Sequence, residues 1–186
     1  MRLPDTAHTS RPWRIHEIAP DFQVEDVWAL PTPGGPDDFP RLVELFILSD
    51  PSRGAPGPAR VLFAIRWKLG ELFGWDSADA SRASLRNRLP EDLRGTAVAA
   101  PAPFSPLFMA GDEWAAELAN RTMHGVMHLG WVADGAGAYR GQMTVLVKPN
   151  GRLGVAYMAA IKPFRHRIVY PSMLRMLERR WRSAGV

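Results

Sequence analysis

The second half of the chain alternates apolar and polar side chains, and this period of two constrains the fold more than any other feature. It predicts consecutive antiparallel strands, which we place at residues 104–109, 113–119, 122–133, 139–148 and 152–162. Asn150-Gly151, a dipeptide typical of hairpin turns, separates the last two. In the last three strands the odd positions are apolar or aromatic, and many even positions are polar. We therefore expect one face of the sheet to be covered and the other to contact water.

A helical pattern follows the last of these strands. Apolar side chains recur there at helical spacing, at Tyr170, Leu174, Leu177 and Trp181. Pro163 suits the first turn of a helix, so we predict that a C-terminal helix begins near this residue and covers the apolar face of the sheet. Pro171 should kink or divide the helix because its ring removes a helix hydrogen bond. Strands followed by one long amphipathic helix predict an α+β architecture.

The first half of the chain is less regular. Residues 13–19 alternate and predict a first strand, whereas residues 24–28 suggest a short helix or turn. Asp37 or Asp38 could cap a helix whose first apolar side chain is Phe39. Apolar side chains at spacings of three and four then predict an amphipathic helix over residues 59–74.

Length and composition fit one domain. The chain has 186 residues, of which 46% are hydrophobic, and can bury a full core. We therefore predict a single domain over residues 1–186. Its 17 prolines and 16 glycines cluster, which, with a polar stretch after residue 74, predicts loop-rich excursions at about 31–36, 51–58 and 75–103.

Composition also excludes several classes of protein. The chain has no cysteine, which excludes disulfides and cysteine-based sites and fits a reducing, cytoplasmic location. Its N-terminus lacks the apolar core of a signal peptide, and no apolar run approaches the roughly 18 residues of a membrane span. Much of the net charge of +4 comes from arginines near the C-terminus. The dipole of a helix favours cations at its C-terminal end, and no nucleic-acid-binding motif accompanies them, so we expect no nucleic-acid partner. No nucleotide fingerprint is present, and we expect no cofactor.

Three short motifs carry a family resemblance. They are Arg66-Trp67-x-x-Gly70-x-x-Phe73-Gly74, Asp112-Glu113 followed by His124, and Gly154-x-x-Tyr157-x-x-x-Ile161-Lys162-Pro163-Phe164-Arg165-His166-Arg167-Ile168-Val169. Together they resemble an uncharacterised bacterial domain-of-unknown-function family related to the SRPBCC (START/polyketide-cyclase-like) superfamily, over roughly residues 10–184. The resemblance implies a helix-grip fold, in which a curved antiparallel sheet wraps around a long C-terminal helix. The family has the sequence Pro-Phe-His at this point, whereas this chain has Arg165 between Phe164 and His166.

The resemblance also implies a function. Members of that superfamily bind sterols, lipids, polyketides or other hydrophobic ligands, and some catalyse cyclisation or dehydration. We therefore expect a small hydrophobic or amphipathic ligand between the sheet and the helix, with His166 near the mouth of the site. Methionine and aromatic side chains suit an adaptable ligand surface, although core packing predicts the same residues. The candidates are Trp114, Met123, Met127, Trp131, Tyr139, Met143 and Tyr157.

Two glutamates and two histidines form a candidate catalytic group. With Asn120-Arg121 as a two-residue turn, Glu117 should lie opposite His124. The same register sets Glu113 opposite His128. Such a group could transfer protons or bind a divalent metal, but the alternation places it on the wet face as ion pairs, so no metal is expected.

Two other functions stay open. A cyclase or dehydratase would need these histidines and glutamates to face the terminal helix. A protein-interaction module would use the basic C-terminal helix as its contact surface. A face of the sheet left open to water could also hold a homodimer contact.

Overall fold

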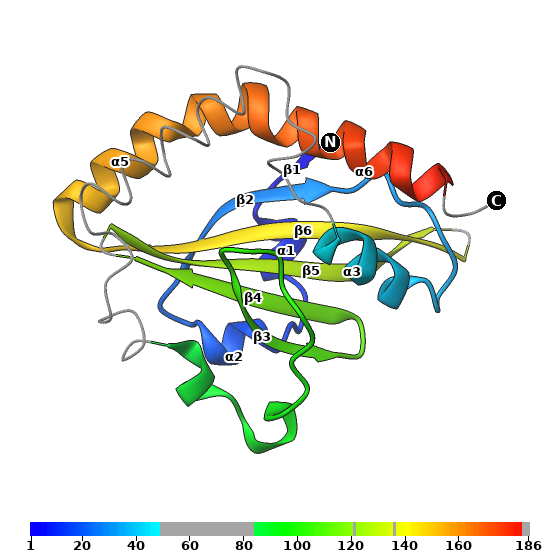
Figure 1. Cartoon of the computed structure of the whole chain (residues 1–186), viewed down its shortest axis with the longest axis horizontal. Coiled ribbons are helices and arrows are strands. Elements are labelled where there is room, and N and C mark those ends of the chain that lie inside the picture. The colour runs from blue at the N-terminus through cyan, green and yellow to red at the C-terminus, as the bar shows by residue number, and fades with distance from the viewer. Residues whose placement is uncertain (49–83, 121, 136, 184–186) are drawn as a thin grey trace.

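The computed structural model describes residues 1–48, 84–120, 122–135 and 137–183 (Figure 1). It has the predicted α+β architecture, with a curved, open, antiparallel sheet of six strands in the order β1-β2-β6-β5-β4-β3. A C-terminal helix of about 30 residues lies across one face of this sheet. The helix predicted over residues 59–74 and the excursion at 51–58 lie outside the described residues.

The described elements follow one another in a simple order. The strands are β1 (Arg2–Leu3), β2 (Gln23–Ala29), β3 (Ser105–Ala110), β4 (Glu113–Ala119), β5 (Met123–Gly135) and β6 (Ala138–Pro149). The helices and turns are α1 (Thr6–Thr9), α2 (Ile15–Ile18), α3 (Phe39–Ile47), the 3-10 turns η2 (Leu85–Arg88) and η3 (Glu91–Leu93), α5 (Gly151–Phe164), the π-helical turn η4 (Arg165–Val169) and α6 (Tyr170–Ser183). None of the helices in this described set is long and apolar enough to cross a bilayer.

The four strands predicted between residues 104 and 148 are confirmed as β3 to β6, within two residues at each end. The helix predicted from Phe39 is confirmed as α3, with Asp38 at its N-cap position. The Asp38 carboxylate, however, accepts the Gly35 N–H at 2.8 Å and makes no cap hydrogen bond to the helix.

The strand predicted at residues 152–162 is wrong, because this segment forms α5. Gly151 has a φ of 67° and starts the helix instead of closing a hairpin. The segment is rich in alanine, which favours helix, and its apolar side chains fit a period of two by coincidence. The terminal helix therefore begins at Gly151, and Pro163 lies inside it. Pro171 lies in the first turn of α6, where the regular helix resumes after the π turn.

The strand predicted at residues 13–19 is also wrong, since this region forms the short helix α2. The segment read as a short helix or turn is instead β2, which pairs with both β1 and β6. A bulge between Val24 and Asp26 breaks the alternation of β2 and hides the strand pattern.

Both faces of the sheet are covered. The terminal-helix face packs against α3 and α6 through a buried cluster that includes Trp28, Phe39, Phe46, Trp114, Trp131, Tyr170 and Trp181. The opposite face packs against α2, η2 and η3 through a second cluster that includes Trp13, Ile15, Ile18, Leu85, Leu93, Phe108 and Val126. The expectation of a wet face is therefore wrong: alternation identifies polar positions, but buried polar side chains can be paired instead of hydrated.

Candidate functional site

A buried carboxylate lies between β2 and the terminal helix. Asp26 is 0% exposed, and three side chains of the terminal helix surround it. The Nε2 atom of His166 is 2.5 Å from Oδ1, and the Tyr170 hydroxyl donates to Oδ2 at 3.0 Å. The Nη2 atom of Arg165 is 3.3 Å from Oδ2. We call these four residues the Asp26 cluster.

The π turn explains how these side chains reach one carboxylate. A π turn holds one more residue than an α turn, which lets Arg165, His166 and Tyr170 approach the same point. Such turns occur frequently at functional sites. The bulge in β2 contributes from the sheet, because it turns Asp26 towards the helix.

Charged groups of both signs lie within and around the cluster. Burial raises the pKa of Tyr170, Arg165 opposes this rise, and Asp26 adds to it, so the phenol stays protonated and donates its hydrogen bond. Arg165 also contacts Glu25 at 2.8 Å, and Lys162 lies 3.3 Å from the same carboxylate. The cluster therefore holds charge inside an otherwise apolar layer.

The sheet continues from Asp26 as an apolar row. Asp26 pairs with Val145 on β6, Val145 pairs with Met127 on β5, and Met127 pairs with Ala116 on β4. Val145 and Met127 are only half-buried, whereas Met143 and Leu129 in the next row are fully buried. The terminal-helix face thus combines a packed region with a row of partly accessible apolar side chains that ends at a charged group.

The predicted ligand-binding residues share this face, with one outside the described set. Trp114, Trp131 and Met143 are buried in its core, and Met127 and Tyr139 pack against that core. Met123 is half-buried at the start of β5, and His166 belongs to the Asp26 cluster. The side chain of Tyr157 lies outside the description.

Sequence reasoning missed three members of the Asp26 cluster. Asp26, Arg165 and Tyr170 were not candidate site residues, whereas His166 was expected near the mouth of the site. The available signal was the acidic pair Glu25-Asp26 inside the apolar stretch from Val24 to Trp28, because a carboxylate in such a stretch needs a partner when buried.

The predicted glutamate–histidine pairs do form, on the face of the sheet away from the terminal helix, where the alternation placed them. Glu117 Oε2 lies 2.7 Å from His124 Nε2, and Glu113 Oε2 lies 3.1 Å from His128 Nε2. The strands are shifted by two residues from the predicted register, since Ala119 is the residue that pairs with His124. The pairs therefore contact each other diagonally.

Each glutamate also binds the backbone of a covering segment. Glu113 accepts the N–H of Arg14 at 2.7 Å and that of Ile15 at 3.4 Å, at the start of α2. Glu117 accepts the Leu85 N–H at 3.0 Å and the Ser84 hydroxyl at 2.5 Å, at the start of η2. These bonds attach two covering segments to the sheet.

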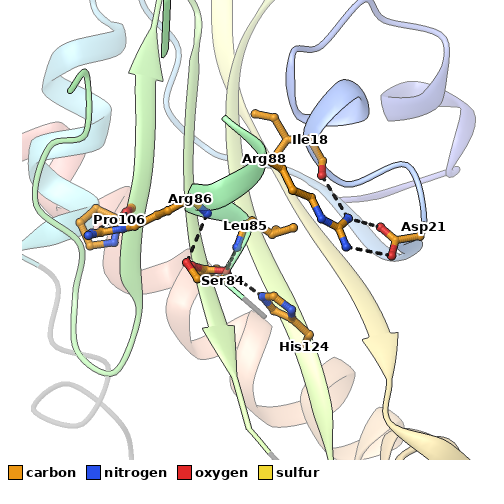
Figure 2. A network of polar contacts seen from close by, with 9 residues as sticks. Ile18, Asp21, Ser84, Leu85, Arg86, Arg88, Pro106 and His124 are labelled. Atoms are coloured by element: carbon orange, nitrogen blue, oxygen red, sulfur yellow. Dashed lines mark hydrogen bonds and ion pairs between the residues drawn. The ribbon is translucent and has the colours of Figure 1, made fainter. Parts of the chain in front are cut away.

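Figure 2 shows the surroundings of the Glu117 contacts, where Ser84, Leu85 and His124 meet around one carboxylate. In the same segment Arg88 binds Asp21 at 2.6 Å. Burial tends to raise the pKa of Glu117, but hydrogen bonds from His124, Ser84 and the Leu85 N–H outweigh it and lower the pKa. The glutamate is therefore ionised and acts as an anchor.

This arrangement bears on two expectations. The histidines and glutamates are buried, not wet, and they face away from the terminal helix as the alternation predicted, whereas a cyclase or dehydratase would need them to face that helix. The surface expected to hold a homodimer contact is covered by α2, η2 and η3. Among the residues described, no three histidine or carboxylate side chains are arranged to hold a metal ion.

Three histidines meet at the edge of this second layer. The ring centroids of His8 and His128 are 5.0 Å apart, and those of His8 and His16 are 4.8 Å apart. His8 is 0% exposed, and both of its ring nitrogens lack a partner within the described chain. Burial, followed by the neighbouring His128 and His16, lowers the pKa of His8 to about 2, so this ring is neutral at physiological pH.

Comparison with known proteins identifies a family. The family of proteins of unknown function designated DUF2867 matches residues 18–172. No curated protein and no solved structure matches the chain. The matched range includes the Asp26 cluster and both glutamate–histidine pairs, whereas His8 and His16 precede it.

Proposed function

Since this chain belongs to the DUF2867 family of proteins of unknown function, we propose its function from its site: it binds a small hydrophobic or amphipathic molecule between the sheet and the C-terminal helix. The observation that carries this proposal is the charged Asp26 cluster set into an apolar face rich in methionine and tryptophan. Ligand sites combine apolar walls with a few placed polar groups in this way. Half-buried Met127 and Val145 would contact the apolar body of the ligand.

The proposal extends to the setting of the protein. We propose that the family is a bacterial relative of the SRPBCC superfamily, in which the ligand binds between the sheet and the terminal helix. The proposal places the protein in the cytoplasm, in keeping with a chain that has no cysteine.

The test uses a fluorescent fatty-acid probe and native mass spectrometry of the full chain. We expect one probe molecule per chain and a rise in the melting temperature. Met127→Trp should fill the apolar row and abolish probe binding. Val155→Trp is the matched control, because Val155 is 58% exposed on α5 and should not affect binding. Failure of a broad apolar library to bind, or equal binding by folded Met127→Trp protein, would contradict the proposal.

A second candidate function at the same site is proton transfer. The 2.5 Å contact between Asp26 and His166 favours it, because a buried carboxylate that orients an imidazole is the usual arrangement of a general base. In that case the extracted ligand should be chemically changed by the wild-type protein, and His166→Gln should bind it without changing it. Recovery of an identical ligand from both proteins would remove this candidate.

A further inference from the structure

Four tryptophans of the terminal-helix face differ in how their indole N–H groups are satisfied. Trp131 donates to the Gly35 carbonyl at 2.9 Å, and Trp181 donates to the Pro33 carbonyl at 2.9 Å. The Nε1 atoms of Trp28 and Trp114 have no partner among protein atoms of the described chain, although these residues are only 8% and 0% exposed. A buried donor left in this state costs the fold stability, so an absent partner is expected to supply an acceptor.

Trp28 lies next to the Asp26 cluster. Its ring centroid is 5.0 Å from that of Tyr170 and 6.1 Å from that of His166. Arg165, in the same cluster, has a second unpartnered donor, because its Nε atom is buried and bonded to no described residue. Two buried donors without acceptors therefore belong to the Asp26 cluster and to the tryptophan beside it.

The polarity of these unsatisfied atoms is uniform. On the terminal-helix face of the described chain, the buried side-chain atoms that lack a partner belong to Trp28, Arg41, Trp114 and Arg165, and all four are N–H donors. A ligand that complements them must supply oxygen or nitrogen lone pairs. A ligand that supplies only N–H or N⁺–H groups would leave every one of them unsatisfied.

Local charge selects among the possible acceptors. Three permanent cations, Arg2, Lys162 and Arg165, contact the two carboxylates of Glu25 and Asp26. The excess cation favours an anionic acceptor over a neutral one. Resting on the proposed binding function, we infer that the ligand is an apolar carboxylic acid whose carboxylate accepts from Trp28 Nε1 and Arg165 Nε, with its hydrocarbon part along Val145 and Met127.

The experiment compares three probes that share one alkyl chain: laurate, lauryl alcohol and laurylamine. Each is titrated into the full chain by calorimetry, and the Trp28 indole N–H signal is followed by NMR. We expect laurate to bind most tightly, lauryl alcohol more weakly and laurylamine weakest. The Trp28 signal should shift with laurate, as expected when its N–H gains an acceptor.

Variants identify the recognising atoms. Trp28→Phe keeps an aromatic ring and removes the indole N–H, so laurate affinity should fall about tenfold while laurylamine affinity stays unchanged. Arg165→Lys keeps the positive charge and removes Nε, so it should also lower the affinity for laurate. Trp131→Phe is the control, because its N–H is already bonded to Gly35 and its loss should not alter the preference for laurate.

The outcomes separate the inference from the proposed function. If none of the three probes binds, the binding function fails and the inference fails with it. If all three bind with equal affinity and folded Trp28→Phe is unaffected, binding stands and the carboxylate assignment is wrong. Tightest binding of laurylamine would likewise overturn the assignment.

Discussion

Acid should destabilise this fold through His8. The pKa of a histidine is ordinarily about 6.5, and burial beside His128 and His16 lowers that of His8 to about 2. At a pH between these two pKa values, His8 is protonated in the unfolded chain but not in the folded chain. The free energy of unfolding therefore falls as the pH is lowered below 6.5. Above that pH the contribution levels off. The loss from pH 7 to pH 5 is about 2 kcal/mol for this one group.

The assay is urea unfolding at pH 5, 6 and 7, followed by tryptophan fluorescence, for wild type and His8→Phe. The variant keeps an aromatic ring against its neighbours and removes the titrating group. The difference in unfolding free energy between the two proteins should therefore change by about 2 kcal/mol in favour of the variant from pH 7 to pH 5. Groups common to both proteins largely cancel in this difference.

His16→Phe is the matched control for this measurement. Burial and His128 lower the pKa of His16, but Glu113 opposes the shift and the ring is partly exposed, so its effect on the pH dependence should be smaller. Parallel stability curves for wild type and His8→Phe across this pH range would refute the reasoning, because they would mean that His8 is protonated equally in the folded and unfolded chains.

Three further substitutions test other contacts. Gly154→Ala should displace the start of α5 and lower the melting temperature, because its Cβ would collide with the Thr122 carbonyl. Gly125→Ala is the control in the same thermal melt: its Cβ would meet only ordinary contacts, so the melting temperature should stay unchanged. Glu117→Gln should cost about 3 kcal/mol in urea unfolding and speed amide exchange in η2; unchanged exchange there would contradict its anchoring role. Asp26→Asn should cost a similar amount, about 3 kcal/mol, because it leaves Arg165 and His166 without their buried carboxylate, and an unchanged urea midpoint would count against this.

Periodicity predicted those parts of the fold in which a single pattern dominates. Strands β3 to β6 alternate over their length, and this pattern also brought the two glutamates and two histidines into the predicted pairs. The prediction of these pairs was correct although the predicted register was wrong by two residues, because a shift of two residues keeps every side chain on the same face. The packing of the terminal helix on the odd-numbered face was predictable for the same reason.

The missed features are those in which two patterns compete. The segment that forms α5 satisfies both a strand period and a helix period, and only its alanine content favours the helix. The bulge at Glu25 interrupts the alternation of β2 and so concealed Asp26. The assignment of a wet face failed because Glu113 and His128, although polar, are paired and covered by a segment more than 90 residues away in sequence.

The extra residue in the π turn determines which side of the terminal helix faces the sheet. Met158 is buried on α5, and Tyr170, twelve positions later, is buried at the start of α6. Because each residue of an α-helix advances by about 100°, an uninterrupted α-helix would rotate Tyr170 well away from the side that Met158 occupies. The π turn absorbs that rotation. An α turn in place of the π turn, at unchanged chain length, would therefore rotate Tyr170, Leu177 and Trp181 together away from their contacts. Deletion of one residue of the π turn would instead leave a regular α-helix that keeps them on the side of Met158.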